Sequence, residues 1–151
     1  MSSVGHMQTR ADLLALKERL ISRGWMRGHY GYTDGPNCIV GGLLMVTKRP
    51  MIIEEEPDSV TYRIKSLDYT ESAARSPEHA RHADAVDLLE GIASARIDAL
   101  NLLTGHHVVD YNDHHAVTFE DILSLIDEAL ATIPEEAQAE TREVVYEPAI
   151  A

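Results

Sequence analysis

The sequence predicts a mostly α fold, in which an irregular bundle of about four helices carries one small β-hairpin. Three observations lead to this prediction. Apolar residues recur at helical spacing near both ends of the chain, and a Ser-Pro-Glu step starts a third periodic stretch between them. A short segment alternates apolar and polar residues beside a Pro-Asp-Ser turn, which is the pattern of a hairpin.

The first helix is expected to begin at Thr9, because Asp12 follows at the three-residue spacing of a capping box. Gly24 can end this helix in a left-handed conformation, and Trp25 would then pack back on its last turn. The apolar stripe of the helix comprises Leu13, Leu16, Leu20 and Ile21.

A turn-rich stretch with three glycines, residues 27–37, leads to a short apolar run at Cys38–Val46. This run could be a buried strand, but Asp34 or Asn37 can serve as an N-cap, so we expect a buried helix. Its two adjacent glycines would be useful where another part of the backbone comes close.

Residues Met51–Ser66 are expected to form the hairpin and to lie against the helices, because two strands alone are marginally stable. The next helix begins with Ser76 as its cap and Pro77 in its first turn, and it could extend to Gly105. Gly91 lies inside this helix and should cost about 1 kcal/mol relative to alanine, so we expect a packing reason for it.

The last helix has Thr118 as its cap, acidic residues in its first turn, and Pro134 at its end. Just before it, Asn112 and Asp113 are residue types that stabilise turns. Its apolar face consists of Phe119, Ile122, Leu123, Ile126, Ala129, Leu130 and Ile133.

These elements place a single helical domain at residues 7–134. Residues 1–6 are expected to be a cloning remnant or a disordered N-terminus, since a Gly-His-Met string often remains from a cloning site. Residues 135–151 form an acidic tail, whose Val144–Tyr146 stretch could dock onto the body or onto a second copy in a homodimer.

The formal net charge of −12 is unevenly distributed. Residues 1–50 carry seven Lys/Arg against three Asp/Glu, whereas residues 51–151 carry six against 22. Nucleic-acid binding needs cations clustered over an extended face, so we expect no nucleic-acid partner. This balance suits a protein that repels its own copies or meets a basic partner.

The single cysteine, Cys38, excludes an internal disulfide and zinc sites built from four thiolates. No apolar run approaches the roughly twenty residues that span a bilayer, and the N-terminus lacks the apolar core of a signal peptide. We therefore expect a cytoplasmic protein without a membrane partner. No complete catalytic signature is present, and we expect no cofactor.

Four of the eight histidines lie in Gly105–Leu130, beside an Asp-Asn-Asp cluster. They form two adjacent pairs, and neighbouring side chains point apart, so a pair seldom supplies two ligands to one metal. We therefore expect no metal site, although these imidazoles would gain charge near pH 6. The residues that could form a zinc site by ligand type are His79, His82, His107 and Asp113.

There are two alternatives to a non-enzymatic protein: a hydrolase or amidase that uses Cys38 with a histidine, and a metal hydrolase whose metal site is built from the His cluster. The dipole of a helix stabilises a thiolate at its N-terminus, and His107 with Asp110 or Asn112 could complete a Cys-His-Asp/Asn set. A lone cysteine at the head of an apolar run is also typical of a small buried side chain. We expect no catalytic site, and the candidates for one are Cys38, His107 and Asp110.

A contact surface is expected in the glycine-rich and aromatic segment after the first helix, because such loops are frequent binding surfaces. The same aromatic residues could instead seal the edge of a small core. The expected partner-binding residues are Trp25, Arg27, Tyr30 and Tyr32.

Three motifs occur in a familiar order: Gly24-Trp25, Cys38 before Gly41-Gly42-Leu43-Leu44, and Tyr111-Asn112-Asp113 before the last helix. This order resembles a family of small uncharacterised proteins, a domain of unknown function found in actinobacteria and their phages. Its members show Gly-Trp, Cys-x-x-Gly-Ala-Leu and Trp-Asn-Asp motifs. The likeness covers about residues 9–133; the chain departs from it at Gly42, at Tyr111 and in the hairpin.

The resemblance implies a compact, mostly helical domain that is phage-encoded or phage-derived, and it carries over no catalytic residue. Together with the acidic charge, it predicts a small cytoplasmic protein that acts without catalysis by binding another protein. In a phage setting, this protein would be a regulatory module that acts on a host protein.

Overall fold

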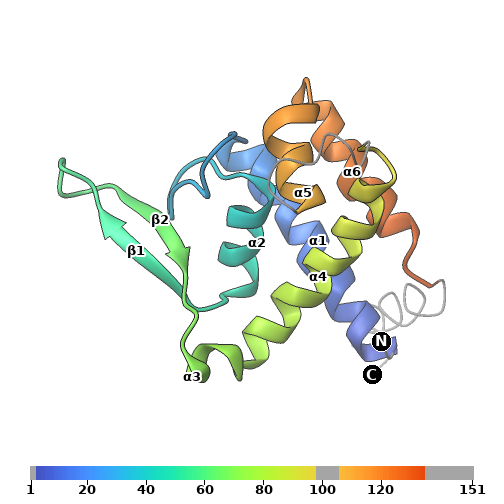
Figure 1. Cartoon of the computed structure of the whole chain (residues 1–151), viewed down its shortest axis with the longest axis horizontal. Helices are drawn as coiled ribbons and strands as arrows, with labels where there is room; N and C mark the ends of the chain where they lie inside the picture. The colour runs from blue at the N-terminus through green and yellow to red at the C-terminus, as the bar shows by residue number, and fades with distance from the viewer. Residues whose placement is uncertain (1–2, 98–105, 135–151) are drawn as a thin grey trace, which may run out of the picture.

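The computed structural model describes residues 3–97 and 106–134, and it confirms the mostly helical prediction. In Figure 1 the helices gather into one body, and an antiparallel hairpin extends from its side. The helices are α1 Ser3–Arg23, α2 Ile39–Thr47, α3 Glu71–Ala74, α4 Pro77–Ser94, α5 His107–Asp110, the π-helix η2 Tyr111–His115 and α6 Phe119–Ala131. The strands are β1 Met51–Glu55 and β2 Tyr62–Leu67. None of the helices in the two described ranges is long and apolar enough to cross a membrane.

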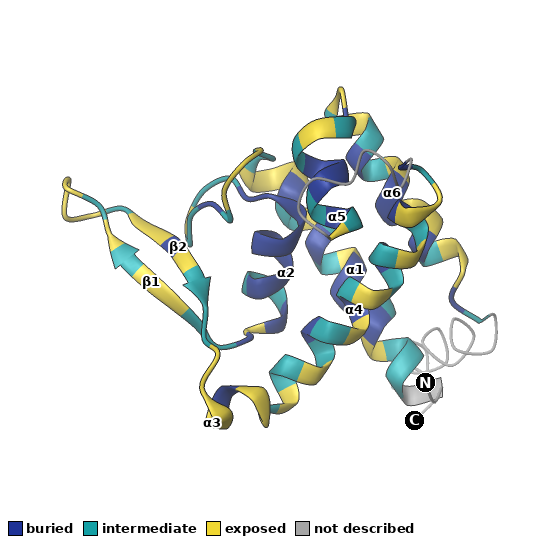
Figure 2. Cartoon of the chain, viewed as in Figure 1, coloured by how far each residue is buried: buried dark blue, intermediate teal, exposed yellow. Residues whose placement is uncertain are grey.

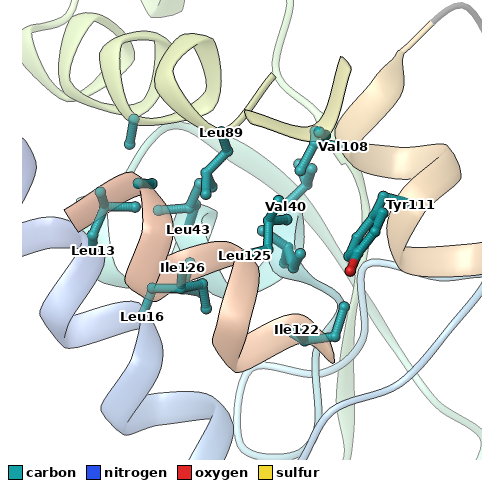
Figure 3. Close-up of a cluster of buried hydrophobic side chains, with 14 of the residues drawn as sticks. Leu13, Leu16, Val40, Leu43, Leu89, Val108, Tyr111, Ile122, Leu125 and Ile126 are labelled. Carbon is teal, nitrogen blue, oxygen red and sulfur yellow. The ribbon is translucent and has the colours of Figure 1, made fainter. Parts of the chain in front are cut away.

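The core lies where α1, α2, α4 and α6 meet, and aliphatic side chains fill most of it (Figure 3). Since the chain has one Trp and one Phe, leucine and isoleucine must supply most of its buried volume. The helix α2 is the most enclosed, with seven of its nine residues buried (Figure 2). The largest fully buried aliphatic side chains are Leu13, Leu16, Leu20, Ile39, Leu43, Leu44, Leu89, Val108, Ile122, Leu125 and Ile126.

Two glycines allow other parts of the chain to touch α2, which is a helix as predicted. A Cβ on Gly41 would lie 1.8 Å from the carbonyl oxygen of Tyr30, and a Cβ on Gly42 would lie 2.6 Å from Leu16 Cδ1. A side chain at Gly41 would displace the backbone of the neighbouring loop, and one at Gly42 would force the Leu16 side chain to move. The expected close approach of another part of the backbone is therefore confirmed at Gly41, whereas Gly42 is in contact with side chains.

The predicted N-cap of α2 was wrong. Cys38 caps the helix, because its Sγ accepts a hydrogen bond from the Gly41 amide at 3.3 Å. Asp34 instead pairs with Arg23 at the surface, and Asn37 binds the carbonyl groups of the preceding loop. Asp34 and Asn37, the two residues whose spacing predicted an N-cap, therefore bind other parts of the structure instead.

The predicted capping box at Thr9 and Asp12 was also wrong, because α1 begins at Ser3. Both side chains are buried within the helix, and Asp12 accepts a hydrogen bond from Arg81 of α4 at 2.6 Å. A buried carboxylate needs such a partner, so Asp12 joins two helices rather than starting one. The predicted end of α1 is confirmed, since Gly24 has a φ of +104°.

The hairpin forms where it was predicted, but a loop rather than a helix holds it. The two strands are antiparallel, with Ile53 opposite Ile64 and Ile52 opposite Ser66, so that a bulge in β2 leaves Lys65 without a partner in β1. The other edge of β2 pairs with the loop: the Ile64 amide donates to the Gly31 carbonyl at 2.8 Å, and the Thr33 amide donates to the Tyr62 carbonyl at 3.0 Å. Among the residues of the two strands Ile64 alone is buried, so the hairpin projects from the helical body (Figure 2).

The helix α4 begins as predicted, since Ser76 Oγ accepts a backbone hydrogen bond in the first turn. It ends at Ser94 and does not continue toward Gly105; residues 98–105 lie outside the described part of the chain. The expected packing reason for Gly91 is absent, because this residue is exposed and a Cβ there would meet nothing within 4 Å.

The last helix, α6, is confirmed together with its cap at Thr118. The Asp121 carboxylate accepts hydrogen bonds from the amides of Val117 at 2.8 Å and Thr118 at 3.1 Å. Its buried residues lie on the predicted apolar face, to which the structure adds Leu125. The segment before α6 is not a simple turn, because α5 continues directly into the π-helix η2.

We expect His82 to make the protein less stable in mild acid. Its ring is buried on α4, and burial, with Arg49 and His79 nearby, lowers its pKa to about 4. In the unfolded chain the ring takes up a proton near pH 6.5, whereas the folded chain resists this until the pH is lower. The contribution of neutral His82 is thus complete above pH 6.5 and is lost as the pH falls toward 4.

Urea denaturation between pH 7 and pH 4.5 should show this loss, which amounts to about 2 kcal/mol for His82 alone. Carboxylates also titrate in this range, so the His82→Gln variant is the control. The difference in unfolding free energy between the two proteins should change by that amount across the range. If the unfolding free energies of the two proteins differed by the same amount at every pH, His82 would be ruled out as the cause.

Candidate functional site

A pocket of about 450 Å³ opens between the hairpin and the helical body. Four parts of the chain form its walls: the loop from Met26 to Tyr32, the start of α2, the strand β2, and residues 109–113. These parts are distant in sequence, so the pocket depends on the contacts that bring them together.

Asn112 joins three of these parts, and it is only 2% exposed. Its Oδ1 accepts hydrogen bonds from the Trp25 indole N–H at 2.8 Å and from the Ile39 amide at 3.1 Å. Its Nδ2 donates to the Met26 carbonyl at 3.1 Å and to Asp113 Oδ1 at 2.8 Å. Four hydrogen bonds occupy this side-chain amide, so Asn112 shapes the pocket rather than serving as a free ligand group.

The π-helix η2 sets the position of Asn112 at the pocket. The Ala116 amide donates to the Tyr111 carbonyl at 2.8 Å, which is the wide i→i+5 spacing of a π-helix. The next residue, Asp113, accepts a hydrogen bond from the Gly28 amide at 2.9 Å. Asn112 and Asp113, which were expected to stabilise a turn, thus both lie in the π-helix η2 and bind the loop after α1.

Asn37 holds the same loop from its other side and is fully buried. Its Nδ2 donates to the carbonyl groups of Tyr30 at 2.9 Å and Tyr32 at 3.0 Å, and its Oδ1 accepts from Arg19 Nε at 2.8 Å. Arg19 also donates to the Thr33 carbonyl at 2.8 Å. The sequence did not predict Asn37 and Arg19 as parts of the site; for Asn37 the available signal was its place after Gly35-Pro36 in a glycine-rich turn.

Trp25 and Arg27, two of the expected partner-binding residues, do not line the pocket. The Trp25 ring stacks on Phe119 with 6.1 Å between centroids, and the Arg27 guanidinium lies 5.1 Å from the centre of the Trp25 ring. Arg27 also donates a hydrogen bond to the Ala116 carbonyl. These two residues fasten the loop to η2 and α6.

Tyr30 and Tyr32, the other two expected partner-binding residues, form an aromatic wall of the pocket. Burial, with Tyr69 and Cys38 nearby, raises the pKa of Tyr30, so its phenol keeps its proton at neutral pH. Apolar side chains from three other parts of the chain share the lining: Val40, Ile64 and Val109. The lining thus combines aromatic residues that carry a hydroxyl group with aliphatic residues, so the pocket can receive an apolar group.

Charged side chains of both signs lie around the pocket. Arg63 pairs with Glu54 at 2.6 Å and with Glu56 at 3.7 Å, so carboxylates already balance its charge. Lys65, also in the lining, forms no ion pair with the residues that the structure describes. The site therefore offers one cation to an acidic or polar group of a ligand.

The candidate catalytic residues do not gather in the pocket. Cys38 lines it but is 8% exposed, and burial raises the pKa of its thiol to about 11, against the weaker opposite effect of the Gly41 amide. His107 lies instead against Glu90, with 3.1 Å between His107 Nδ1 and the carboxylate. Asp110 is buried and is not part of the lining. At neutral pH the thiol is protonated and therefore a weak nucleophile.

The candidate metal ligands also lie in separate parts of the structure. His79 and His82 lie on α4, whereas His107 contacts Glu90 and Asp113 binds the Gly28 amide. Over residues 3–97 and 106–134, no group of three or more His, Cys, Asp or Glu side chains is arranged to hold a metal ion.

A protein-family model described as "Family of unknown function (DUF6197)" matches residues 6–132. The match spans nearly the whole stretch over which the motifs resemble a domain of unknown function. No curated protein and no solved structure matches the chain.

We expect the Asn112→Ala variant to lower the free energy of unfolding by about 3 kcal/mol, because it leaves the buried amide of Ile39 and the Trp25 indole N–H without an acceptor. Asp113→Asn is the matched control, since it keeps the oxygen that accepts from Gly28 and Asn112. Urea denaturation of the two variants should give a much smaller loss for the control. Equal losses would show that the Asn112 amide has no special role.

We expect Cys38 to react with iodoacetamide roughly a hundredfold more slowly than an unstructured thiol at pH 7.5, because its raised pKa leaves little thiolate. The alkylation rate should keep rising to about pH 11. Protein unfolded in urea provides the control and should react at the ordinary rate. Fast labelling with an apparent pKa below 8 would restore Cys38 as a candidate nucleophile.

Proposed function

We propose that this chain, which belongs to the DUF6197 family of unknown function, is a non-enzymatic module that binds a segment of another protein. The observation that carries the proposal is the pocket between the loop after α1 and the hairpin. Its volume of about 450 Å³ falls within the range of protein sites that enclose a ligand. Such a space can hold one or two apolar side chains of a partner.

The composition of the pocket supports a binding role. Tyr30 and Tyr32 combine a large apolar ring with a hydroxyl group, and tyrosine is enriched in protein interfaces. Next to them the hairpin exposes further apolar surface, including Val60 at 78% and Tyr62 at 44%. Apolar surface that gathers beside a pocket is typical of a contact site.

The rigidity of the loop also supports this proposal. Asn37 and Asn112 bind its backbone from two sides, so the positions of Tyr30 and Tyr32 are set before a partner arrives. A surface that is ordered in advance loses less conformational entropy on binding.

The chemistry of the lining favours binding over catalysis. Cys38 is the one thiol in the lining, and its raised pKa leaves it protonated at neutral pH. The histidine of the proposed catalytic set, His107, is occupied by Glu90. In the setting that the motif resemblance implies, an actinobacterial or phage-infected cytoplasm, the bound protein would be a host protein that this chain regulates.

Site-specific photo-crosslinking tests the proposal. A benzoyl-phenylalanine replaces Tyr32 in the pocket, or replaces Ile21, which is 59% exposed on α1, as a control. Each protein is irradiated in cells and its adducts are identified by mass spectrometry. We expect the probe at Tyr32 to yield one recurrent protein, cross-linked through one segment, and the probe at Ile21 to yield none.

Adducts of the same kind and amount from both positions would contradict the proposal, and so would their absence at Tyr32. Tyr30→Ala provides a second measurement, because it removes a wall of the pocket without adding charge. It should reduce the Tyr32 adduct severalfold. Circular dichroism of this variant shows whether the fold is retained.

A further inference from the structure

We infer that the open edge of β1 is a second contact surface, which accepts an extended strand with basic side chains from a partner protein. The contact would consist of main-chain hydrogen bonds along β1, with Glu55 of this chain facing Lys or Arg of the partner. It lies across β2 from the pocket and does not depend on the binding proposed there.

The hydrogen bonds of β2 show which backbone groups of β1 face outward. The Ile64 amide and the Tyr62 carbonyl are bound to the loop on the far side of β2, so both residues direct these groups away from β1. In an antiparallel pair, residues opposite each other direct their backbone groups either toward one another or both away. The opposite residues are Ile53 and Glu55, whose N–H and C=O groups therefore face the open edge.

This edge strand is short, pairs with β2 across a bulge and carries two glutamates, but Lys and Pro, which often protect an edge strand, are missing from it. In the described part of the chain β2 is the only strand paired with β1, and the isolated bridge in this region, between Tyr32 and Arg63, involves β2. Ile52 and Ile53 are each 47% exposed, and β1 contains neither Lys nor Pro. An apolar edge of this kind is a template for another strand.

Charge identifies the kind of strand that fits. Three glutamates follow one another at the end of β1, and two of them, Glu54 and Glu56, already pair with Arg63. Glu55 is exposed and forms no ion pair within the described ranges. Opposite charges across a strand pair stabilise it, so the complementary strand carries basic residues. The net charge of −12 attracts such a partner over a longer range.

The same charges argue against a second copy of this chain on the edge. A symmetric pairing that uses both open residues would place Ile53 of one copy opposite Glu55 of the other. Glu54 would then lie directly opposite its own equivalent, and like charges in that position are destabilising. Two chains of −12 also repel each other.

Nuclear magnetic resonance on the ¹⁵N-labelled full chain tests the inference. The probe is an acetylated and amidated octapeptide of alternating valine and lysine, and the counter-probe has glutamate in place of lysine. We expect the lysine peptide to shift the amides of Ile53 and Glu55 and to slow their hydrogen exchange at least fivefold. The glutamate peptide should do neither.

Two variants separate main-chain pairing from general attraction to an acidic surface. Glu55→Pro removes an outward N–H without removing a bond to β2, and it should weaken binding of the lysine peptide at least tenfold. The Ile64 amide reports whether the hairpin persists; if it does not, Ile53→Lys serves instead, with the same expected loss. Tyr32→Ala, in the pocket, should leave the binding unchanged.

Three outcomes would overturn the inference. The first is the absence of shifts at Ile53 and Glu55 up to millimolar peptide. The second is equal binding of the two peptides. The third is a dimer in sedimentation that Glu55→Pro dissociates, because it would make a second copy the occupant of the edge.

Discussion

The side-chain amide of Asn112 is the interaction on which the rest of this structure depends. It binds the loop after α1, the first residue of α2 and the neighbouring Asp113 at once, from a site that is almost fully buried. A hydrogen bond in such a place is stronger than one in water, and its loss leaves buried groups unpaired. The pocket lies where these three segments meet, so its shape follows from this amide.

Apolar burial and side-chain hydrogen bonds stabilise different parts of this structure. The aliphatic core holds α1, α2, α4 and α6 together, but apolar burial has no direction and cannot fix the path of a glycine-rich loop. Asn37 and Asn112 supply the missing direction, because each binds specific backbone groups of that loop. The loop in turn pairs with β2 and holds the hairpin at the side of the body.

The hairpin carries charged side chains of both signs, and some of them have no ion pair in the described ranges. Arg63 is balanced by two glutamates, while Lys65 at the pocket and Glu55 at the strand edge have no ion pair in the described ranges. The pocket and the edge thus offer different chemistry on the two sides of one hairpin. A partner that contacts both would have to present an apolar group to one and a basic strand to the other.

By itself, the sequence determined the elements whose signals are local: the buried helix α2, the hairpin, the Ser76 cap of α4, and α6 with its Thr118 cap. The spacing of apolar residues, the capping residues and the turn residues all act over a few positions of the chain. They therefore predict a helix or strand without knowledge of the tertiary structure. Only the tertiary structure decided that Cys38 rather than Asn37 caps α2, that Asp12 bonds to Arg81, and that Asn112 and Asp113 sit in a π-helix. It also separated Tyr30 and Tyr32, which line the pocket, from Trp25 and Arg27, which do not. Asp12 and Asn112 show the physical reason, because their partners in other parts of the fold lie at least 69 residues away in the chain and only folding brings them within reach.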